Sequence, residues 1–172
     1  AALYNNTTGN HNTAVGLNSA YNNTTGSNNV SMGVNSFRLN TTGEQNVAIG
    51  RDCLESNTTA SNNVAVGYQA LDATQTGHSN VAVGANALGA NTTSFNTAVG
   101  FNAARDTTSG LANVAVGTSS LVSNTTGDSN TAIGLDCLQQ NTTASANTGV
   151  GRDALKQNTT GTNNVAIGSY AL

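Results

Sequence analysis

A five-residue phrase, Asn-(Val/Thr)-Ala-(Val/Ile)-Gly, recurs ten times with minor variants and constrains the fold more than any other feature of the chain. Its glycines are Gly16, Gly33, Gly50, Gly67, Gly84, Gly100, Gly117, Gly134, Gly151 and Gly168. Successive glycines are 17 residues apart, except that Gly84 and Gly100 are 16 apart. A fixed short period indicates that each unit is one coil of a stacked structure.

The columns of the phrase predict how one coil is built. The fourth residue before each glycine is always Asn: Asn12, Asn29, Asn46, Asn63, Asn80, Asn96, Asn113, Asn130, Asn147 and Asn164. The third is Val or Thr, the second is mostly Ala, and the first is always apolar. Strand alternation puts the third and first residues on one face and the Ala on the other. We expect the Val/Ile row to point into the coil and the Ala row to point outward.

The second half of each unit carries a small residue and then usually Leu, as in Cys53-Leu54 and Ala70-Leu71. This pattern predicts a second short strand whose Leu meets the Val/Ile row. Asn-Thr-Thr-Gly or Asn-Thr-Thr-Ala segments then form turns, because Asn and Gly adopt positive φ readily. The residue missing before Asn96 is expected in such a turn. The sequence therefore predicts an all-β fold, a β-solenoid of ten coils of about 17 residues, with residues 1–172 as a single repeat array.

Composition excludes several function classes. The net charge is −3, and no basic stripe that would bind nucleic acid is present. No apolar run approaches the roughly 20 residues that span a bilayer, so we expect no membrane insertion by this segment. No Ser-His-Asp, HExxH, CxxC or phosphate-loop pattern occurs, so we expect no enzyme, cofactor or metal site. Both chain ends fall at the same point of the repeat, which suggests a segment of a longer fibre.

A five-coil echo lies over the 17-residue period, because Gly43–Gly67 closely matches Gly127–Gly151. Duplication of a five-coil block explains this match. Cys53 and Cys137 occupy the same coil position in the two copies. Five coils separate them by roughly 24 Å, too far for an intrachain disulfide. Buried thiols or an interchain bridge are the two interpretations left open.

Few other side chains suggest chemistry. His11 and His78 occupy different turn positions, and we expect both to be exposed. Asp136 and Asp153 occupy equivalent positions in adjacent coils, so their carboxylates should lie about 5 Å apart. Such a pair could share a proton or hold a cation. A solvated charge cluster that includes Arg152 is the plainer explanation.

The Asn-Thr-Thr segments allow two further interpretations. They match the N-glycosylation signal, with possible acceptors Asn40, Asn57, Asn91, Asn124, Asn141 and Asn158, although turn formation alone also explains them. Rows of Thr on a flat solenoid face could also bind ice. However, adjacent Thr residues point to opposite faces of a strand, and a flat ice-binding face is expected to use Thr-x-Thr.

The segments NVAVGYQAL (Asn63–Leu71) and NTAIGLDCL (Asn130–Leu138), with the NTTG turns between them, resemble the repeats of tail-fibre-like proteins. They also resemble the head domains of trimeric autotransporter adhesins, whose repeat is usually shorter. The resemblance covers essentially the whole chain. It implies a left-handed parallel β-roll, three chains side by side, and a role in adhesion or reach.

These observations together predict the shaft or head of an extracellular, cell-surface or virion fibre. An outward Ala row would invite close approach of another copy, so the first expected partner is the chain itself, as a homotrimer or filament. A second is a host-surface glycan or protein. The expected ligand contacts are the variable residues directly after glycine: Arg51, Tyr68, Phe101 and Arg152. The alternatives are a filament subunit without receptor binding and an ice-binding solenoid.

Overall fold

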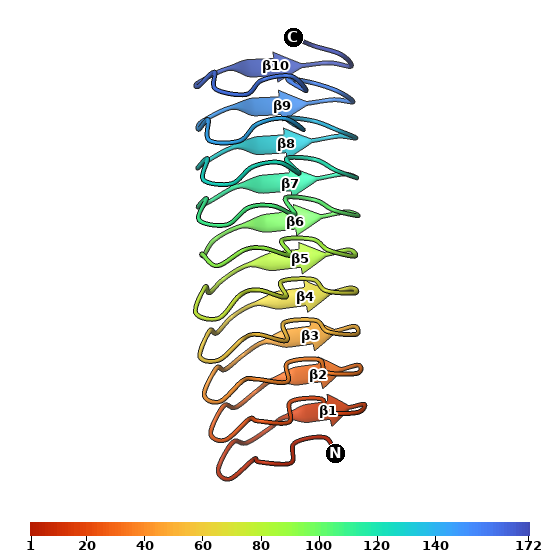
Figure 1. The fold of residues 1–172 in the computed structure, drawn as a ribbon, viewed down its shortest axis with the longest axis vertical. Helices are drawn as coiled ribbons and strands as arrows, with labels where there is room; N and C mark the ends of the chain where they lie inside the picture. Colours follow the sequence, from red (N-terminus) through yellow and green to blue (C-terminus); the bar gives the residue numbers. More distant parts are fainter.

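The computed structural model describes residues 1–172 as a β-solenoid whose coils stack along one axis (Figure 1). Ten three-residue strands form a single parallel sheet in the order β1 to β10, so each strand pairs only with its neighbours in the chain. They are β1 (Thr13–Val15), β2 (Val30–Met32), β3 (Val47–Ile49), β4 (Val64–Val66), β5 (Val81–Val83), β6 (Thr97–Val99), β7 (Val114–Val116), β8 (Thr131–Ile133), β9 (Thr148–Val150) and β10 (Val165–Ile167). The expected all-β solenoid is confirmed.

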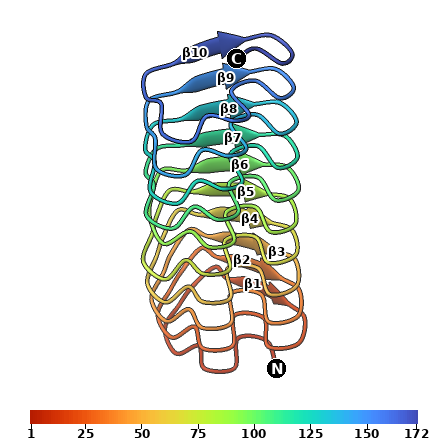
Figure 2. The same cartoon turned by 45° about the horizontal axis from the view of Figure 1, so that its top comes forward.

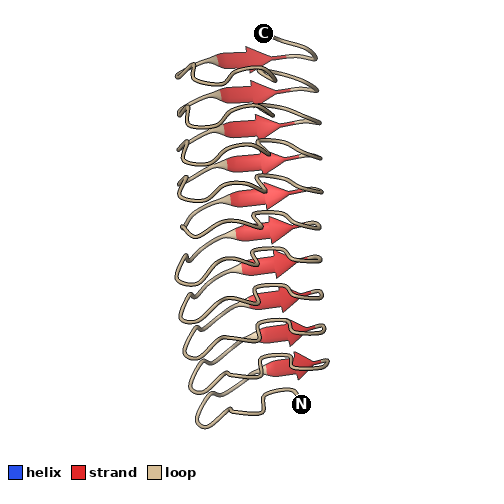
Figure 3. Cartoon of the chain, viewed as in Figure 1, coloured by secondary structure: helices blue, strands red, loops and turns tan.

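The remainder of each coil is made of turns and loops that superpose from one coil to the next (Figure 2). Only one side of the stack carries strands (Figure 3). Pairing joins residues 17 apart, except that Val81 pairs with Thr97 and Val83 with Val99 across the 16-residue coil. The strands stay in register because the missing residue is absorbed in the turn before Asn96, as the sequence predicted.

The faces of the strands are the reverse of the prediction. The middle residue of each strand points into the coil, and Ala48, Ala65 and Ala82 are fully buried, whereas the residues on either side point outward. The coil is too thin for anything larger. Where Ser occupies this row, the Ser31 hydroxyl lies 3.1 Å from that of Ser36 across the coil. The predicted association through an outward Ala row is therefore wrong, because the Ala row is the interior.

Leucine completes the core as predicted, but it packs against the Ala row instead of the Val/Ile row. Leu54, Leu71 and Leu88 are fully buried and belong to one cluster of 22 buried residues. The predicted second strand does not form. Leu54 has φ 49° and Asp52 has φ 53°, so this stretch is a turn with left-handed residues. Asn and Asp tolerate that conformation better than most residues, which explains why they are frequent two residues after glycine.

Main-chain hydrogen bonds between coils take the place of that second strand. The Leu54 amide donates to the Ala70 carbonyl of the next coil at 3.0 Å, and of 109 backbone hydrogen bonds only 18 lie within the strands. The glycines of the repeated phrase are also required by the stacking of the coils. Its φ angles run from 127° to 143°, and a Cβ at Gly50 would collide with the carbonyl group of Gly67. Only glycine suits such a position.

The invariant asparagines four residues before glycine form a ladder inside the stack. The backbone amide of Asn46 donates to Oδ1 of Asn29 at 2.9 Å, and Asn46 Nδ2 donates to the Ala60 carbonyl at 2.9 Å. The same pattern recurs between Asn63 and Asn80, with an amide-to-Oδ1 distance of 2.9 Å. Buried amides are tolerated when their hydrogen bonds are made, so this ladder connects the coils without weakening the core.

Candidate functional site

The outer face of the sheet is an uncharged surface that runs along the whole stack. It consists of two columns, the residues three and one before each glycine, and every member is Val, Ile, Met or Thr. Ile49 and Val83 are each 37% exposed, and Ile133 is 40% exposed, although these are the apolar residues that a core would normally enclose. The sequence analysis identified these residues and assigned them to the wrong side.

The extent of this sheet face can be bounded from strand geometry. Ten rungs at about 4.8 Å give a length of roughly 43 Å, and the span from three residues to one residue before glycine gives a width of about 7 Å. The area is then on the order of 300 Å², within the range of the largest apolar patches that monomeric proteins expose. Large apolar patches of this kind mark contact surfaces.

The residues predicted to contact a ligand lie along one edge of the sheet face, directly after glycine. The Arg51 guanidinium carbon lies 5.4 Å from the centroid of the Tyr68 ring, and Arg51 Nε lies 2.9 Å from Asp52 Oδ2. Phe101 is 53% exposed, two coils beyond Tyr68. Arg152 lies further along, so the structure brings together only Arg51 and Tyr68. The four residues form an exposed row and do not converge on one pocket.

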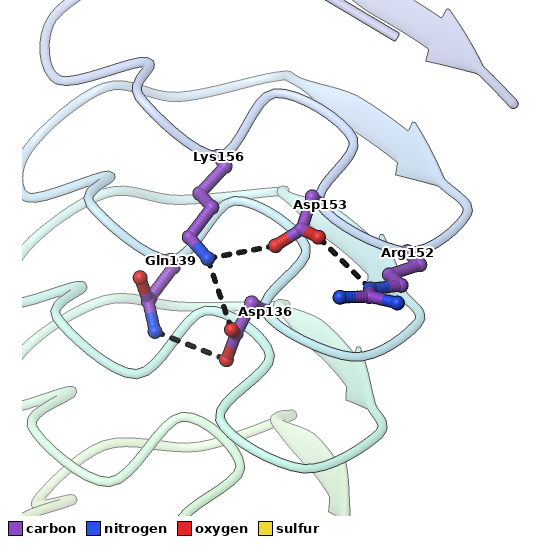
Figure 4. Close-up of polar contacts among 5 residues, drawn as sticks. All are labelled: Asp136, Gln139, Arg152, Asp153 and Lys156. Carbon is purple, nitrogen blue, oxygen red and sulfur yellow. Dashed lines mark hydrogen bonds and ion pairs between the residues drawn. The ribbon is translucent and has the colours of Figure 1, made fainter. Parts of the chain in front are cut away.

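The carboxylate pair of the sequence analysis is held together by a lysine (Figure 4). Lys156 Nζ lies 3.0 Å from Asp136 Oδ2 and 2.7 Å from Asp153 Oδ1. Gln139 donates to Asp136 at 3.0 Å, and Arg152 pairs with Asp153 at 3.1 Å. The hydrogen bond from Lys156 lowers the pKa of Asp153 and raises that of Lys156. The ammonium group thus occupies the place where a bound cation was considered.

Lys156 was not among the residues expected at this site. Its position three residues after Asp153, in a turn, was the signal in the sequence that could have identified it.

The pKa of another acidic group, Asp72, is shifted in the direction opposite to that of Asp153. Burial, together with the neighbouring carboxylates Glu55 and Asp52, raises the pKa of Asp72 to about 6. No three His, Cys, Asp or Glu side chains lie close enough together to hold a metal ion.

Both cysteines are structural. Cys53 and Cys137 are fully buried, which favours the buried thiols over the interchain bridge, because neither sulfur reaches the surface of the chain. Burial raises the pKa of Cys53 to about 12 and that of Cys137 to about 11, so neither thiol ionises near neutral pH. Cys137 packs against the chain at Gly149, where an added Cβ would lie 2.6 Å from its sulfur. The equivalent pair Cys53 and Ala65 fits with the Cβ present, so the glycine of β9 has no structural explanation.

The folded coil leaves no room for a glycan on the Asn-Thr-Thr asparagines. Five of the six candidate acceptors are fully buried: Asn40, Asn57, Asn91, Asn124 and Asn141. Asn158 is half-buried, and its Nδ2 donates to Asn141 Oδ1 at 3.2 Å and to the Gly161 carbonyl at 2.9 Å. The amide nitrogen that would carry a sugar is used inside the stack in each case. Turn and ladder formation therefore accounts for these segments.

The two Thr residues of each of these turns have different roles. The first Thr donates its hydroxyl to the carbonyl of the equivalent Thr in the next coil, as Thr41 does to Thr58 at 3.0 Å. The second Thr, such as Thr42 or Thr59, is exposed. This flank therefore presents one free column of Thr hydroxyls and not the two columns of a Thr-x-Thr face.

The histidines lie in two separate turns. His11 and His78 are both exposed, and the His78 ring meets the Phe95 ring edge-on at a centroid distance of 4.9 Å.

The structure has no helix long and apolar enough to cross a bilayer. Comparisons with protein-family models, with curated proteins and with solved structures found no match.

Proposed function

We propose that this chain is a non-catalytic structural element of an extracellular, cell-surface or virion fibre, in which copies of the chain pack side by side through the sheet face. One observation carries the proposal. Ten stacked rungs present an uninterrupted outer surface of uncharged, mostly β-branched residues. Burying about 300 Å² of such surface on each copy is favourable at roughly 25 cal/mol per Å².

The proposed occupant of the sheet face is a second and third copy of the same chain. Each copy has the same rung spacing, so flat faces can meet along their whole length without a charge being buried. Standard interfaces bury about 800 Å² on each partner, and two neighbours in a closed trimer would cover more of the face than one neighbour in a dimer. The resemblance to trimeric adhesin heads agrees with three copies.

The adhesive part of the proposal rests on the exposed row after glycine. Arg51, Tyr68, Phe101 and Arg152 are variable among the coils while the interior columns repeat. Weak contacts to a host-surface glycan or protein would be multiplied by the number of copies in the fibre. The mechanism is mechanical and multivalent, since a rigid stack holds these contacts away from the surface that anchors it.

The assembly is tested by replacing Val83 and Ile133 with Lys in one variant and measuring the mass in solution by light scattering. We expect wild-type protein to be oligomeric and the double variant to be monomeric with unchanged circular dichroism, because charges on the sheet face cannot be desolvated. Thr59→Lys, an exposed change on the turn flank, is the control and should leave the oligomer intact. A monomeric wild-type protein would refute side-by-side packing.

Receptor binding is separated from a purely structural filament by glycan-array and cell-binding measurements on the assembled protein. Binding that is lost when Arg51 and Tyr68 are replaced by Ala supports the adhesive role. Oligomers that bind no host surface favour the filament subunit. Thermal hysteresis would instead support the ice-binding alternative, which the single exposed Thr column makes the weaker one.

A further inference from the structure

A second asparagine ladder, formed by the first residue of the turns, is interrupted in the middle of the rod. The row reads Asn6, Asn23, Asn40, Asn57, Thr74, Asn91, Thr107, Asn124, Asn141 and Asn158. Threonine thus replaces asparagine at two places, one on each side of the 16-residue coil that ends at Gly100. The interruptions lie between the two echoing segments, Gly43–Gly67 and Gly127–Gly151.

The ladder is continuous outside this region. In the first block, Asn40 Nδ2 donates to Asn23 Oδ1 at 2.6 Å and Asn57 Nδ2 donates to Asn40 Oδ1 at 2.8 Å. In the last block, Asn141 Nδ2 donates to Asn124 Oδ1 at 3.0 Å. Each of these bonds joins one coil to the next inside a buried region, where an amide hydrogen bond contributes most.

Threonine is too short to continue this pattern, and unpaired polar atoms result. Two buried side-chain atoms lack a hydrogen-bond partner, Asn57 Oδ1 and Thr107 Oγ1, and they mark the two edges of the interruption. Thr74 donates its hydroxyl to the Asn91 carbonyl at 2.7 Å and accepts a long hydrogen bond of 3.4 Å from Asn91 Nδ2, so Asn57 Oδ1 is left without a donor. An unpaired buried polar atom loses its hydration without compensation, so coil-to-coil contact is weakened here.

Main-chain hydrogen bonds between the turns are missing both beside the short coil and in the later block. The amides of residues 75–77 donate no hydrogen bond, as is also true of residues 142–144. By contrast, the amides of Thr41 and Thr42 both donate to the Thr58 carbonyl in the next coil. Because the amides of residues 142–144 are unpaired where the asparagine ladder is intact, the broken ladder, and not the main chain, distinguishes the middle of the rod.

We infer that residues 74–110, between β4 and β7 in Figure 1, form a joint that links two fully laddered blocks. The joint opens locally and bends before either block does, because its side-chain ladder is broken at Thr74 and Thr107 and two buried polar atoms are left without a partner. This inference goes beyond the proposed function, since it concerns the single chain and does not depend on a receptor or on the number of copies. A rod with such a joint yields at a defined point under load.

Hydrogen exchange followed by mass spectrometry tests the joint in the wild-type protein. We expect amides of residues 74–110 to exchange about tenfold faster or more than the equivalent amides of residues 40–57 and 124–141, as the loss of one or two buried hydrogen bonds implies. Only interior coils are compared, so fraying at the ends of the stack does not enter. Uniform exchange across the three segments would overturn the inference.

Substitutions in the second asparagine ladder test whether its interruption causes the faster exchange. Restoring the ladder with Thr74→Asn and Thr107→Asn together should slow exchange in the joint toward that of the blocks, while Thr76→Asn, an exposed change in the same turn, should not. The reverse change, Asn40→Thr, should create fast exchange within the first block. If the double variant failed to fold, Asn40→Thr alone would decide, and unchanged exchange in that variant would contradict a joint made by the missing ladder.

Discussion

The segments Gly43–Gly67 and Gly127–Gly151 are two copies of one unit, and the comparison between them separates what the stack requires from what it tolerates. Their interiors agree closely, with Cys53-Leu54 in one copy and Cys137-Leu138 in the other, all four side chains buried, although Gly149 stands where the earlier copy has Ala65. The coils that follow the two segments carry opposite charges at one position. Lys156 bridges two carboxylates in the later copy, whereas Asp72 holds the equivalent place in the earlier one.

This difference shows that surface charge on the turn flank does not determine the fold. The earlier copy keeps the same register although Asp72 adds a third acid to Asp52 and Glu55. Arg51 and Arg38 partly compensate, since Arg38 pairs with Glu55 at 2.6 Å. Exposed ion pairs contribute little to stability, so the repeated interior columns outweigh the charges around them.

The largest expected effect comes from the shared interior. Gly50→Ala and Gly134→Ala should each lower the free energy of unfolding by at least about 2 kcal/mol, because both residues have φ near 135° and the new Cβ would meet the glycine carbonyl of the next coil. Chemical denaturation measures both. Gly89→Ala is the control, since its nearest neighbour would lie at 3.4 Å, and it should be nearly neutral. Very different losses at Gly50 and Gly134 would break the equivalence of the copies.

A smaller effect is expected where the copies differ. Asp72→Lys should raise the free energy of unfolding by on the order of 1 kcal/mol, since it removes a half-buried carboxylate from two others and supplies the ammonium found in the later copy. Lys156→Asp should lower the denaturation midpoint, because it leaves Asp136 and Asp153 without their shared cation. Glu44→Lys, an exposed exchange of the same charge, should do neither. Equal responses of Asp72→Lys and Glu44→Lys would show that only net charge matters.

The smallest effect is a pH dependence confined to the earlier copy. The pKa of Asp72 is about 6 in the folded protein and near 3.8 when unfolded, so the folded state binds a proton more tightly. Stability should therefore rise as pH falls from 7 toward 4, by under about 1 kcal/mol after solvent screening of this half-exposed group. Asp72→Asn should flatten the curve. Asp153, whose pKa is lowered, contributes above pH 4 and loses that contribution only in more acidic solution. A curve that Asp72→Asn leaves unchanged would assign the titration to another group.

Much of the fold follows from the repeat alone, and the reason is stacking. A phrase that recurs every 17 residues, with Asn80 and Asn63 in equivalent places, can bury those amides only if equivalent residues lie over one another. The period therefore determines the parallel pairing and its register, and the 16-residue interval before Gly100 locates the shortened turn. The Cys53–Cys137 separation follows as well, since five intervening coils exclude an intrachain disulfide.

Only the tertiary structure shows which side chains of each strand point into the coil and which point outward. Strand alternation separates Ala48 from Val47 and Ile49 but is symmetric, so it cannot say which set faces the core. Side-chain size suggested Val and Ile, and this was wrong because the Leu54 turn approaches the strand too closely for anything beyond a methyl group. The same close approach buries Asn40 and exposes the sheet face. The sequence by itself determined how the coils stack, because equivalent residues must lie over one another. The tertiary structure decided which side chains form the interior, because the thickness of the coil limits the size of the residues that fit inside it.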